Sequence, residues 1–438
     1  MRILLAATYE TGRQPFGLAS PAAILRQAGH TVDCADTAVR ALDADAVRGA
    51  DLIAFHLPMH TATKLAIPLI RRVRTLQPKA AICCYGLYAE LNAEHLRELG
   101  VEAILGAEFE TGLLALANGA GPAEPDAIGR VAFVTPDRST LPALDLYASL
   151  DRGGRRDTVG YTEASRGCKH LCRHCPVVPV YNGVFRAVPG GVVLADIRQQ
   201  VESGARHISF GDPDFFNGPT HAIRIVEALH RDFPAASYDV TIKIEHLLRH
   251  RDLLPTLART GCLFVTSAVE SVDDAVLAKL DKGHTRAGFH EAVGACRDAG
   301  LAISPTFVAF TPWTTPATYR AMLRDIADLG LVENVAPVQL ALRLLITAKS
   351  RLLELDDIRA IAREFDPAAL VHPWKHSDPA MDDLAACTLA AAHRMQASGA
   401  TRTQSFSAVW RLAHEGPAPA FHLPARAAIP YLTEPWYC

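Results

Sequence analysis

Three cysteines in one short segment are the residues of this sequence best suited to chemistry. The segment ASRGCKHLCRHCPVVPVY places Cys168, Cys172 and Cys175 at the spacing C-x3-C-x2-C. The remaining cysteines are thinly spread over 438 residues, so chance is a poor explanation for this group. Thiolates on so short a loop can converge on a metal centre, because small spacers let the backbone wrap around it. The spacing therefore predicts a metal or iron–sulfur site.

Three ligand sets are open for this site. His170 or His174 could complete a Cys3His zinc site. A distant thiolate from Cys262, Cys296 or Cys387 could complete a four-cysteine iron–sulfur cluster. In the third set, a four-iron cluster has only three cysteine ligands, and its open iron can chelate a substrate or cofactor.

The elements that must position these cysteines alternate between strands and helices. Residues 1 to 118 contain strand-like runs at 2–8, 51–58, 80–86 and 101–110, separated by helical patterns. Parallel strands need crossover helices, so this alternation predicts a Rossmann-like, doubly wound α/β domain. The Gly-, Ala- and Pro-rich stretch NGAGPAEPDAIG at 118–129 opens a linker that we extend over 119–160.

A second alternation begins at Tyr161. Its expected strands are the one at Tyr161 and those at 207–212, 237–244, 262–270, 302–310 and 334–345. Six strand and helix pairs over 161–349 favour a partial (β/α)6 barrel over a second Rossmann sheet. Residues 350–438 form a helical and irregular C-terminal region in this interpretation. The cysteine segment then directly follows the first barrel strand.

Composition narrows the class of protein. Lys plus Arg is 44 and Asp plus Glu is 47, so the net charge of −3 offers no basic field for a nucleic-acid partner. No apolar stretch approaches the roughly 20 residues that would span a bilayer, and the opening MRILLAATYE is too short for a secretory signal. We therefore expect a cytoplasmic globular protein with no membrane partner.

The three-cysteine loop after the first strand of a partial barrel resembles the signature of the radical S-adenosylmethionine enzymes. The resemblance implies that Cys168, Cys172 and Cys175 hold a [4Fe-4S] cluster whose open iron binds S-adenosylmethionine. In that family, an electron from the reduced cluster breaks a carbon–sulfur bond and releases a carbon radical. His174 stands where the family often has an aromatic side chain near the adenine, with an exposed loop histidine as the alternative.

Two further motifs match the family at strand ends. HISFGDPDFF at 207–216 stands where the family binds the amino group of the cofactor, which makes Gly211 and Asp212 the matching positions. The usual Gly-Gly-Glu is absent, and a simple strand-end turn is the alternative. SAVESVDDAVLAKLDKGHT resembles a segment of the cobalamin-linked branch and places Glu270 at the barrel mouth as a cofactor contact, or else as a helix cap.

Polar residues interrupt two apolar runs of the expected barrel. Lys243 and Glu245 alternate with isoleucines, so we expect them to share one face of a strand. Gln339 and Arg343 lie in the last expected strand. Buried polar groups are costly unless paired, so we expect both to line the barrel and contact the cofactor, with a partly exposed edge as the alternative.

The first domain resembles the cobalamin-binding type that precedes the barrel in one branch of the family. The resemblance rests on RQPFGLASPAAILRQAGHTVDCAD, DLIAFHLPMHTATKLAIPLIRRV and ILGAEFET. The loop YETGRQPFG lacks the histidine that often ligates cobalt in such domains. The resemblance thus allows cobalamin as a third cofactor, and the alternative is a degenerate Rossmann domain used for packing or substrate binding.

The carboxyl terminus YLTEPWYC resembles the start of the tail in the CUAEP/CCAEP-tail radical S-adenosylmethionine family. In that family the tail contains selenocysteine, so the resemblance makes Cys438 the first tail residue. A mobile terminal thiol is the alternative.

We therefore expect an enzyme that cleaves S-adenosylmethionine reductively and starts hydrogen abstraction or methyl transfer. Its partners would be a small-molecule or peptide substrate and a reducing donor such as flavodoxin or ferredoxin. The competing class is a binding or redox-sensing protein stabilised by zinc or an iron–sulfur cluster. NAD-dependent chemistry is disfavoured, because no G-x-G-x-x-G follows the first strand.

Overall fold

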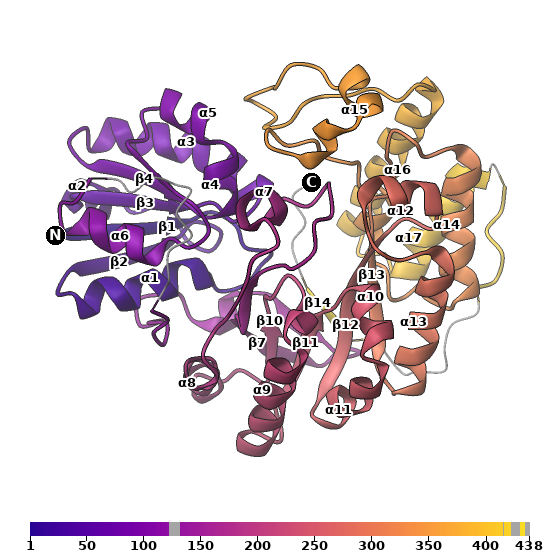
Figure 1. Cartoon of the computed structure of the whole chain (residues 1–438), viewed down its shortest axis with the longest axis horizontal. Helices are drawn as coiled ribbons and strands as arrows, with labels where there is room; N and C mark the ends of the chain where they lie inside the picture. The colour runs from indigo at the N-terminus through magenta and orange to yellow at the C-terminus, as the bar shows by residue number, and fades with distance from the viewer. Residues whose placement is uncertain (122–131, 415, 422–429, 434–438) are drawn as a thin grey trace.

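A computed structural model describes residues 1–121, 132–414, 416–421 and 430–433. Its amino-terminal part is a five-stranded parallel sheet in the order β2-β1-β3-β4-β5 with helices on both faces (Figure 1). The elements are β1 Arg2–Ala7, α1 Phe16–Gln27, β2 Thr31–Asp36, α2 Ala44–Gly49, β3 Leu52–His56, α3 His60–Leu76, β4 Ala81–Tyr85, α4 Leu87–Leu91, α5 Ala93–Glu98, β5 Ala103–Leu105 and α6 Glu110–Ala117. All of β3 is buried, as a strand covered on both faces requires. The expected Rossmann-like, doubly wound fold is confirmed.

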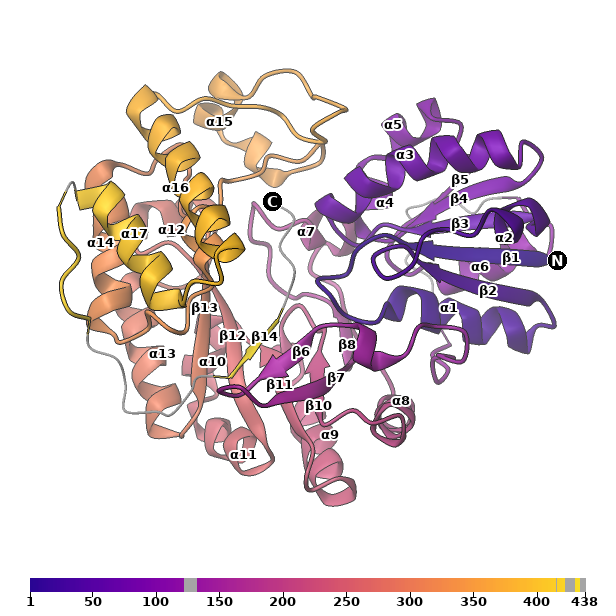
Figure 2. The ribbon, with the colours of Figure 1, turned by 180° about the vertical axis from the view of Figure 1, so that it is seen from behind.

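The second part is a curled half-barrel, as expected. Its seven-stranded sheet has the order β13-β12-β11-β10-β7-β6-β14 (Figure 2). β7 and β10 to β13 are parallel, and β6 is antiparallel to both of its neighbours, β7 and β14. The strands are β6 Ser149–Asp151, β7 Arg156–Thr162, β10 His207–Phe210, β11 Ser237–Thr241, β12 Cys262–Glu270, β13 Ala302–Phe307 and β14 Tyr431–Leu432. The covering helices are α8 Gly190–Glu202, α9 Pro219–Asp232, α10 Ile244–Arg249, α11 Leu254–Arg259, α12 Asp274–Leu280, α13 Arg286–Asp298 and α14 Pro316–Asp328.

The barrel departs from the expected strands in three places. β6 and the start of β7 lie within the stretch 119–160, so the sheet begins before Tyr161. The expected placement of Lys243 and Glu245 on a strand is wrong, because β11 ends at Thr241 and α10 begins at Ile244. Of the expected strand at 334–345, the described structure keeps one bridge, Phe310 to Arg343, after a 3-10 turn at Pro337–Leu340.

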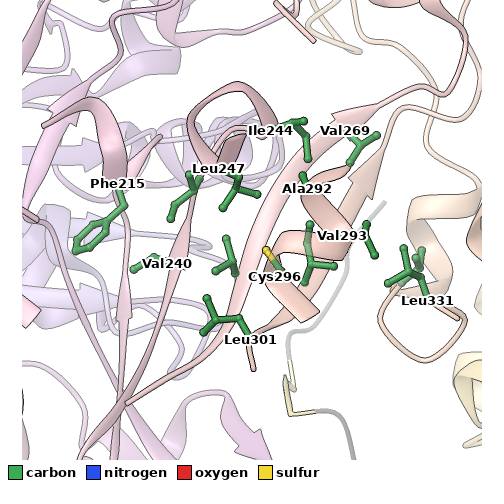
Figure 3. Close-up of a cluster of buried hydrophobic side chains, with 14 of the residues drawn as sticks. Phe215, Val240, Ile244, Leu247, Val269, Ala292, Val293, Cys296, Leu301 and Leu331 are labelled. Atoms are coloured by element: carbon green, nitrogen blue, oxygen red, sulfur yellow. The ribbon is translucent and has the colours of Figure 1, made fainter. Parts of the chain in front are cut away.

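The hydrophobic core of the half-barrel lies between the sheet and its outer helices. Val240 and Val269 of the strands face α10 and α13, whose Ile244, Ala292 and Cys296 point toward the sheet (Figure 3). All five are buried. The opposite face of the strands carries polar side chains, so the inside of the half-barrel is left for a ligand rather than for packing.

A carboxyl-terminal region continues from the barrel through α15 Asp356–Ile361, α16 Pro379–Ala397 and α17 Arg402–His414. α16 and α17 pack beside α14 at the outer edge of the half-barrel (Figure 2). The stretch around α15 reaches across to the first domain, where His60 Nε2 lies 2.7 Å from the carbonyl oxygen of Ala369. This stretch therefore contacts α3 of the first domain.

Two sequence predictions fall partly or wholly outside the described residues. Most of the linker stretch 118–129 and all of YLTEPWYC after Thr433, including Cys438, belong to residues that the structure does not describe. Among the helices it does describe, none is long and apolar enough to cross a bilayer.

Candidate functional site

The three cysteines follow a short hairpin made of β8 Ser165–Gly167 and β9 Phe185–Ala187, and they precede α7 Val177–Tyr181. Gly167 turns the chain into the loop at φ +72, where an added Cβ would lie 2.3 Å from the carbonyl oxygen of Val184. Only glycine fits such a position without strain. Arg173 N donates to the carbonyl oxygen of Leu280 at 2.9 Å, which ties the loop to the end of α12.

The cysteine thiols are free, largely buried and close to one another. Cys168 and Cys172 are 9% and 6% exposed. Burial raises the pKa of Cys175 to about 12, and the nearby Cys172 and Cys168 add to this rise. Thiols that resist ionisation become thiolates when a metal coordinates them. The donor set therefore fits a metal cluster held by three cysteines.

Two buried lysines supply positive charge beside these sulfurs. Lys243 Nζ lies 3.8 Å from Cys172 Sγ, and its side chain is 9% exposed. Burial opposes a charged Lys282, yet Glu270 and then Cys172 and Cys175 raise the pKa of Lys282 above its usual value. Both ammonium groups favour anionic ligands or thiolates in this pocket.

Glu270 is the last residue of β12 and lies in a buried polar cluster with His174 and Lys282. Glu270 Oε1 accepts from His174 Nε2 at 3.0 Å and lies 3.3 Å from Lys282 Nζ. Burial alone would raise the pKa of Glu270, but Lys282 and His174 bring it down to about 2. Its φ of +66 is rare for a residue with a side chain, and such strain is often found at functional sites.

Asp212 and Gly211 lie at the end of β10, on the other side of the loop. Asp212 accepts from Ala164 N at 2.9 Å and from the hydroxyl of Ser165, so it supports the strand that leads into Cys168. The space of a Cβ on Gly211 is occupied by the ring of Tyr161, whose Oη would lie 1.9 Å away. Glycine is therefore needed at position 211 because a side chain there would collide with the Tyr161 ring.

Gln339 and Arg343, the two remaining predicted site residues, have different surroundings in the structure. Gln339 lines the inside of the half-barrel, where its Oε1 accepts from Phe307 N at 3.1 Å. Arg343 donates from Nη1 to Asp382 Oδ1 of α16 at 2.6 Å and stacks over the ring of Trp374. It therefore attaches the carboxyl-terminal region.

The inside of the half-barrel holds a cavity of about 270 Å³. The strands contribute mostly polar groups to its wall, among them Asp239, Thr241, Thr266, Ser304 and Thr306. Asp239 accepts from the buried His207 Nε2 at 2.9 Å. The sequence interpretation missed this pair, although polar residues alternate with apolar ones in HISF and SYDV.

A second cavity, of about 230 Å³, lies between the two sheets. Glu10, His56 and Gly86 from the carboxyl edge of the first sheet face Arg166 and Tyr181 of the cysteine region across it. In the strand order of this domain, ligands bind at this edge, between β1 and β3. Sites for drug-sized ligands measure about 300 to 1,000 Å³, and a corrinoid is larger. The cavity in this form does not fit a whole cobalamin.

The alternative ligand sets for the cysteines find little support in the geometry. His174 is paired with Glu270, and His170 faces His246 at 3.2 Å. Cys262 begins β12 and is separated from Glu270, beside the loop, by roughly 26 Å at 3.3 Å per residue. Cys296 lies in the core of Figure 3, and Cys387 is exposed on α16.

Residues 162–329 match the model of the Radical SAM superfamily. This region is a radical SAM domain. Domains of this family use a [4Fe-4S] cluster and S-adenosylmethionine. The match covers the cysteine loop, Gly211, Asp212 and Glu270, so all of these residues belong to the radical SAM domain.

Two curated relatives match different shares of the chain, and the first match is longer than the radical SAM domain. The hopanoid C-3 methylase of Methylococcus capsulatus is 26% identical over 321 residues, which are 68% of this chain and 62% of that protein. This chain thus spans less than two thirds of that relative. A tRNA-2-methylthio-N(6)-dimethylallyladenosine synthase of Chlorobium limicola is 25% identical over 38% of this chain and 39% of its own length.

Two solved structures are similar in fold over most of this chain. The cobalamin-dependent S-adenosylmethionine radical enzyme OxsB, solved with aqua-cobalamin, has a TM-score of 0.67 at 13% identity and covers 91% of this chain and 67% of its own. The radical S-adenosylmethionine methyltransferase TsrM from Kitasatospora setae, solved with tryptophan and a cofactor analogue, has a TM-score of 0.59 at 16% identity over 75% and 71%. At these identities the likeness concerns the fold.

Proposed function

We propose that this chain is a radical S-adenosylmethionine enzyme that cleaves its cofactor reductively and starts radical chemistry on a small molecule or peptide. The observation that carries the proposal is the set of three neighbouring thiols, two of them on buried residues, inside a radical SAM domain. When bound, the cluster and S-adenosylmethionine supply an electron transfer that breaks a carbon–sulfur bond.

The residues around the loop have separate tasks in this proposal. Lys243 and Lys282 balance negative charge beside the sulfurs, and the half-barrel excludes water from the reacting groups. His174, Asp212, Glu270 and Gln339, together with the Gly211 backbone, are the cofactor-facing set. Arg343 serves as a positioning residue through Asp382 and Trp374. A flavodoxin or ferredoxin is the reductant we expect.

The inner cavity favours a small polar substrate. Its volume of about 270 Å³ is below the usual range for drug-sized ligands, and its wall carries a carboxylate and several hydroxyl groups. An apolar polycyclic lipid would cover this polar wall without adding a hydrogen bond to it, and burial of polar groups without such compensation is unfavourable. We therefore propose a substrate unlike a hopanoid, despite the likeness to the methylase.

Anaerobic reconstitution with iron and sulfide tests the proposal. We expect a brown iron–sulfur absorbance and, on reduction, conversion of S-adenosylmethionine to 5'-deoxyadenosine. The Cys168→Ala, Cys172→Ala, Cys175→Ala triple variant should lose both signals, whereas Cys387→Ala, on the exposed face of α16, should keep them. Stoichiometric zinc at the three cysteines without cleavage would instead support the binding or sensing protein.

Methyl transfer with cobalamin is the second candidate function. The order of the first sheet and the position of the cavity at its carboxyl edge favour it, as do the two solved structures of similar fold, but the two sheets would have to move apart to admit a whole cobalamin. Purified protein incubated with cobalamin and passed through a desalting column tests this candidate. Retention of one cobalamin per chain supports methyl transfer, and none retained limits the proposal to hydrogen abstraction.

A further inference from the structure

A second group of metal-binding side chains lies beside the cysteine loop but uses none of its sulfurs. His170 stands in the loop between Cys168 and Cys172, Asp214 follows β10, and His246 belongs to α10. Asp214 Oδ2 lies 2.7 Å from His246 Nδ1 and 3.7 Å from His170 Nε2. The two Nε2 atoms are 3.2 Å apart. Three distant segments thus bring two imidazoles and a carboxylate to one place.

This place is largely shielded from solvent. The side chains of Asp214, His246 and His170 are 0%, 6% and 16% exposed. Bulk water therefore has little access to the polar atoms of these three side chains and cannot readily supply hydrogen bonds to them.

Two of these buried atoms lack a hydrogen bond among the described residues. Asp214 Oδ2 and His246 Nδ1 are both fully buried and close together, but their contact does not have hydrogen-bond geometry. The other oxygen, Asp214 Oδ1, accepts from Phe216 N at 3.1 Å and is already used. A buried polar atom without a partner costs about 1 to 3 kcal/mol and calls for an explanation.

We propose that His170, Asp214 and His246 bind one divalent transition-metal ion, Zn²⁺ being the best fit. Ligands at about 2.0 to 2.1 Å in a tetrahedral array lie roughly 3.3 Å from one another. With His246 Nδ1 as its ligand atom, Asp214 Oδ2 lies 2.7 Å from that nitrogen and 3.7 Å from His170 Nε2, on both sides of that value. The three residues each offer one ligand atom, and these atoms all lie within 4.8 Å of one another. A cation at this point satisfies the two atoms that otherwise have no partner.

The surroundings prepare His170 for this role. Glu245 Oε2 lies 3.6 Å from His170 Nδ1, the nitrogen that points away from the site. A carboxylate at this nitrogen favours a proton there, which leaves Nε2 as the ligand, as in many histidine metal sites. Lys243, 3.7 Å from Glu245, balances the charge of that carboxylate.

The ion would fasten the cysteine loop to two elements of the barrel. His170 moves with Cys168 and Cys172, whereas Asp214 and His246 are fixed by the turn after β10 and by α10. The bound ion therefore holds the loop in place without taking part in its iron–sulfur chemistry, and this role does not depend on the proposed function.

Metal analysis of the full chain tests the proposal, with zinc and iron counted per chain after reconstitution of the cluster. We expect one zinc in addition to the cluster iron. Co²⁺ in place of zinc should give visible d–d absorption bands. His246→Gln should lose the zinc and the cobalt bands, and His250→Gln, one turn further along the same segment, should keep both.

Asp214→Asn is a gentler variant, because its amide oxygen can still accept from Phe216 N. We expect its zinc affinity to fall by more than about 100-fold, beyond what loss of an outer partner costs. The triple cysteine-to-alanine variant should keep the zinc. Two results would overturn the proposal: zinc that disappears with the cysteines, or zinc absent from the wild type because the two histidines only form a hydrogen bond.

Discussion

Two carboxylates at neighbouring strand ends respond to burial in opposite ways. Lys282 and His174 outweigh burial at Glu270 and leave its pKa at about 2. Burial dominates at Asp212 and raises its pKa to about 7, although Ser165 and Ala164 N donate to it. The radical SAM domain therefore has one permanent anion beside the cysteine loop and one carboxyl group that titrates near neutrality.

Asp212→Asn tests this difference through the pH dependence of stability. A carboxyl group whose pKa is raised on folding binds more protons in the folded than in the unfolded state. Its stabilising effect is thus complete at low pH and is lost as the pH rises through about 7. Between pH 6 and pH 8 the wild type should lose about 1 kcal/mol of unfolding free energy relative to the variant in urea denaturation. Parallel pH profiles for the two proteins would contradict the assignment.

The residues that sequence reasoning found are those whose role depends on local spacing. Cys168, Cys172 and Cys175 lie on one loop, so their proximity follows from the sequence alone. Lys282 and His246 were missed because their partners, Glu270 and Asp214, come from other elements. No local pattern indicates which distant side chain completes a buried charge.

The end of β10 is shaped by its neighbouring strand β7. Tyr161 of β7 fills the space above Gly211, with Oη and Cζ at 1.9 and 2.3 Å from the position of an added Cβ. A side chain here would push the ring into the inner cavity, which Tyr161 also lines. Packing between β7 and β10 at this point therefore also determines the shape of the cavity wall.

Gly211→Ala should therefore destabilise the fold by about 1 to 3 kcal/mol through overpacking. Gly294 lies inside α13 with open space around it, so Gly294→Ala is a matched control that should stabilise by about 0.5 to 1 kcal/mol. A double-mutant cycle with Tyr161→Ala in chemical denaturation measures the coupling. Additive effects of the two substitutions would show that the contact with Tyr161 is not the cause.

Two segments that the sequence predicts as strands but that leave the sheet show where hydrophobic periodicity is ambiguous. Ile242, Lys243, Ile244 and Glu245 alternate as in a strand, yet the chain leaves the sheet after Thr241. Ile242, which precedes the helix, and Ile244, its first residue, are both buried although neither lies in a strand, so alternation over four residues fits either state. In the last expected strand, Pro337 starts a 3-10 turn because proline cannot donate to a sheet. The apolar runs at 51–58 and 262–270 are longer, and the sequence correctly predicted the strands β3 and β12 there.

At the scale of the whole molecule, a buried arginine joins the two sheets. Arg166 of β8 donates from Nη1 and Nη2 to the two carboxylate oxygens of Glu110, at 3.0 and 2.6 Å, across the boundary to α6. Its Nε donates to Glu163 at 2.8 Å, and its guanidinium lies over the ring of Phe109. Because Arg166 precedes Cys168 by two residues, the contact between the sheets also fixes the start of the cysteine loop.

Removal of one partner from this pair should cost more than removal of both. Glu110 is fully buried and accepts from two Arg166 nitrogens and from Ser20 Oγ. Glu110→Gln leaves one amide oxygen for these buried donors, although Glu163 still pairs with Arg166 Nε. We expect a loss of about 3 to 5 kcal/mol in unfolding free energy, with part of it restored in the Glu110→Gln, Arg166→Met double variant. Arg48→Met, in an exposed pair with Asp45, should change stability by less than about 1 kcal/mol.

Iron content after reconstitution provides a second measurement. If the contact orients the cysteine loop, Glu110→Gln should retain less iron than the wild type at a temperature where both are folded. Full iron retention with the expected loss of stability would restrict Arg166 to holding the sheets together.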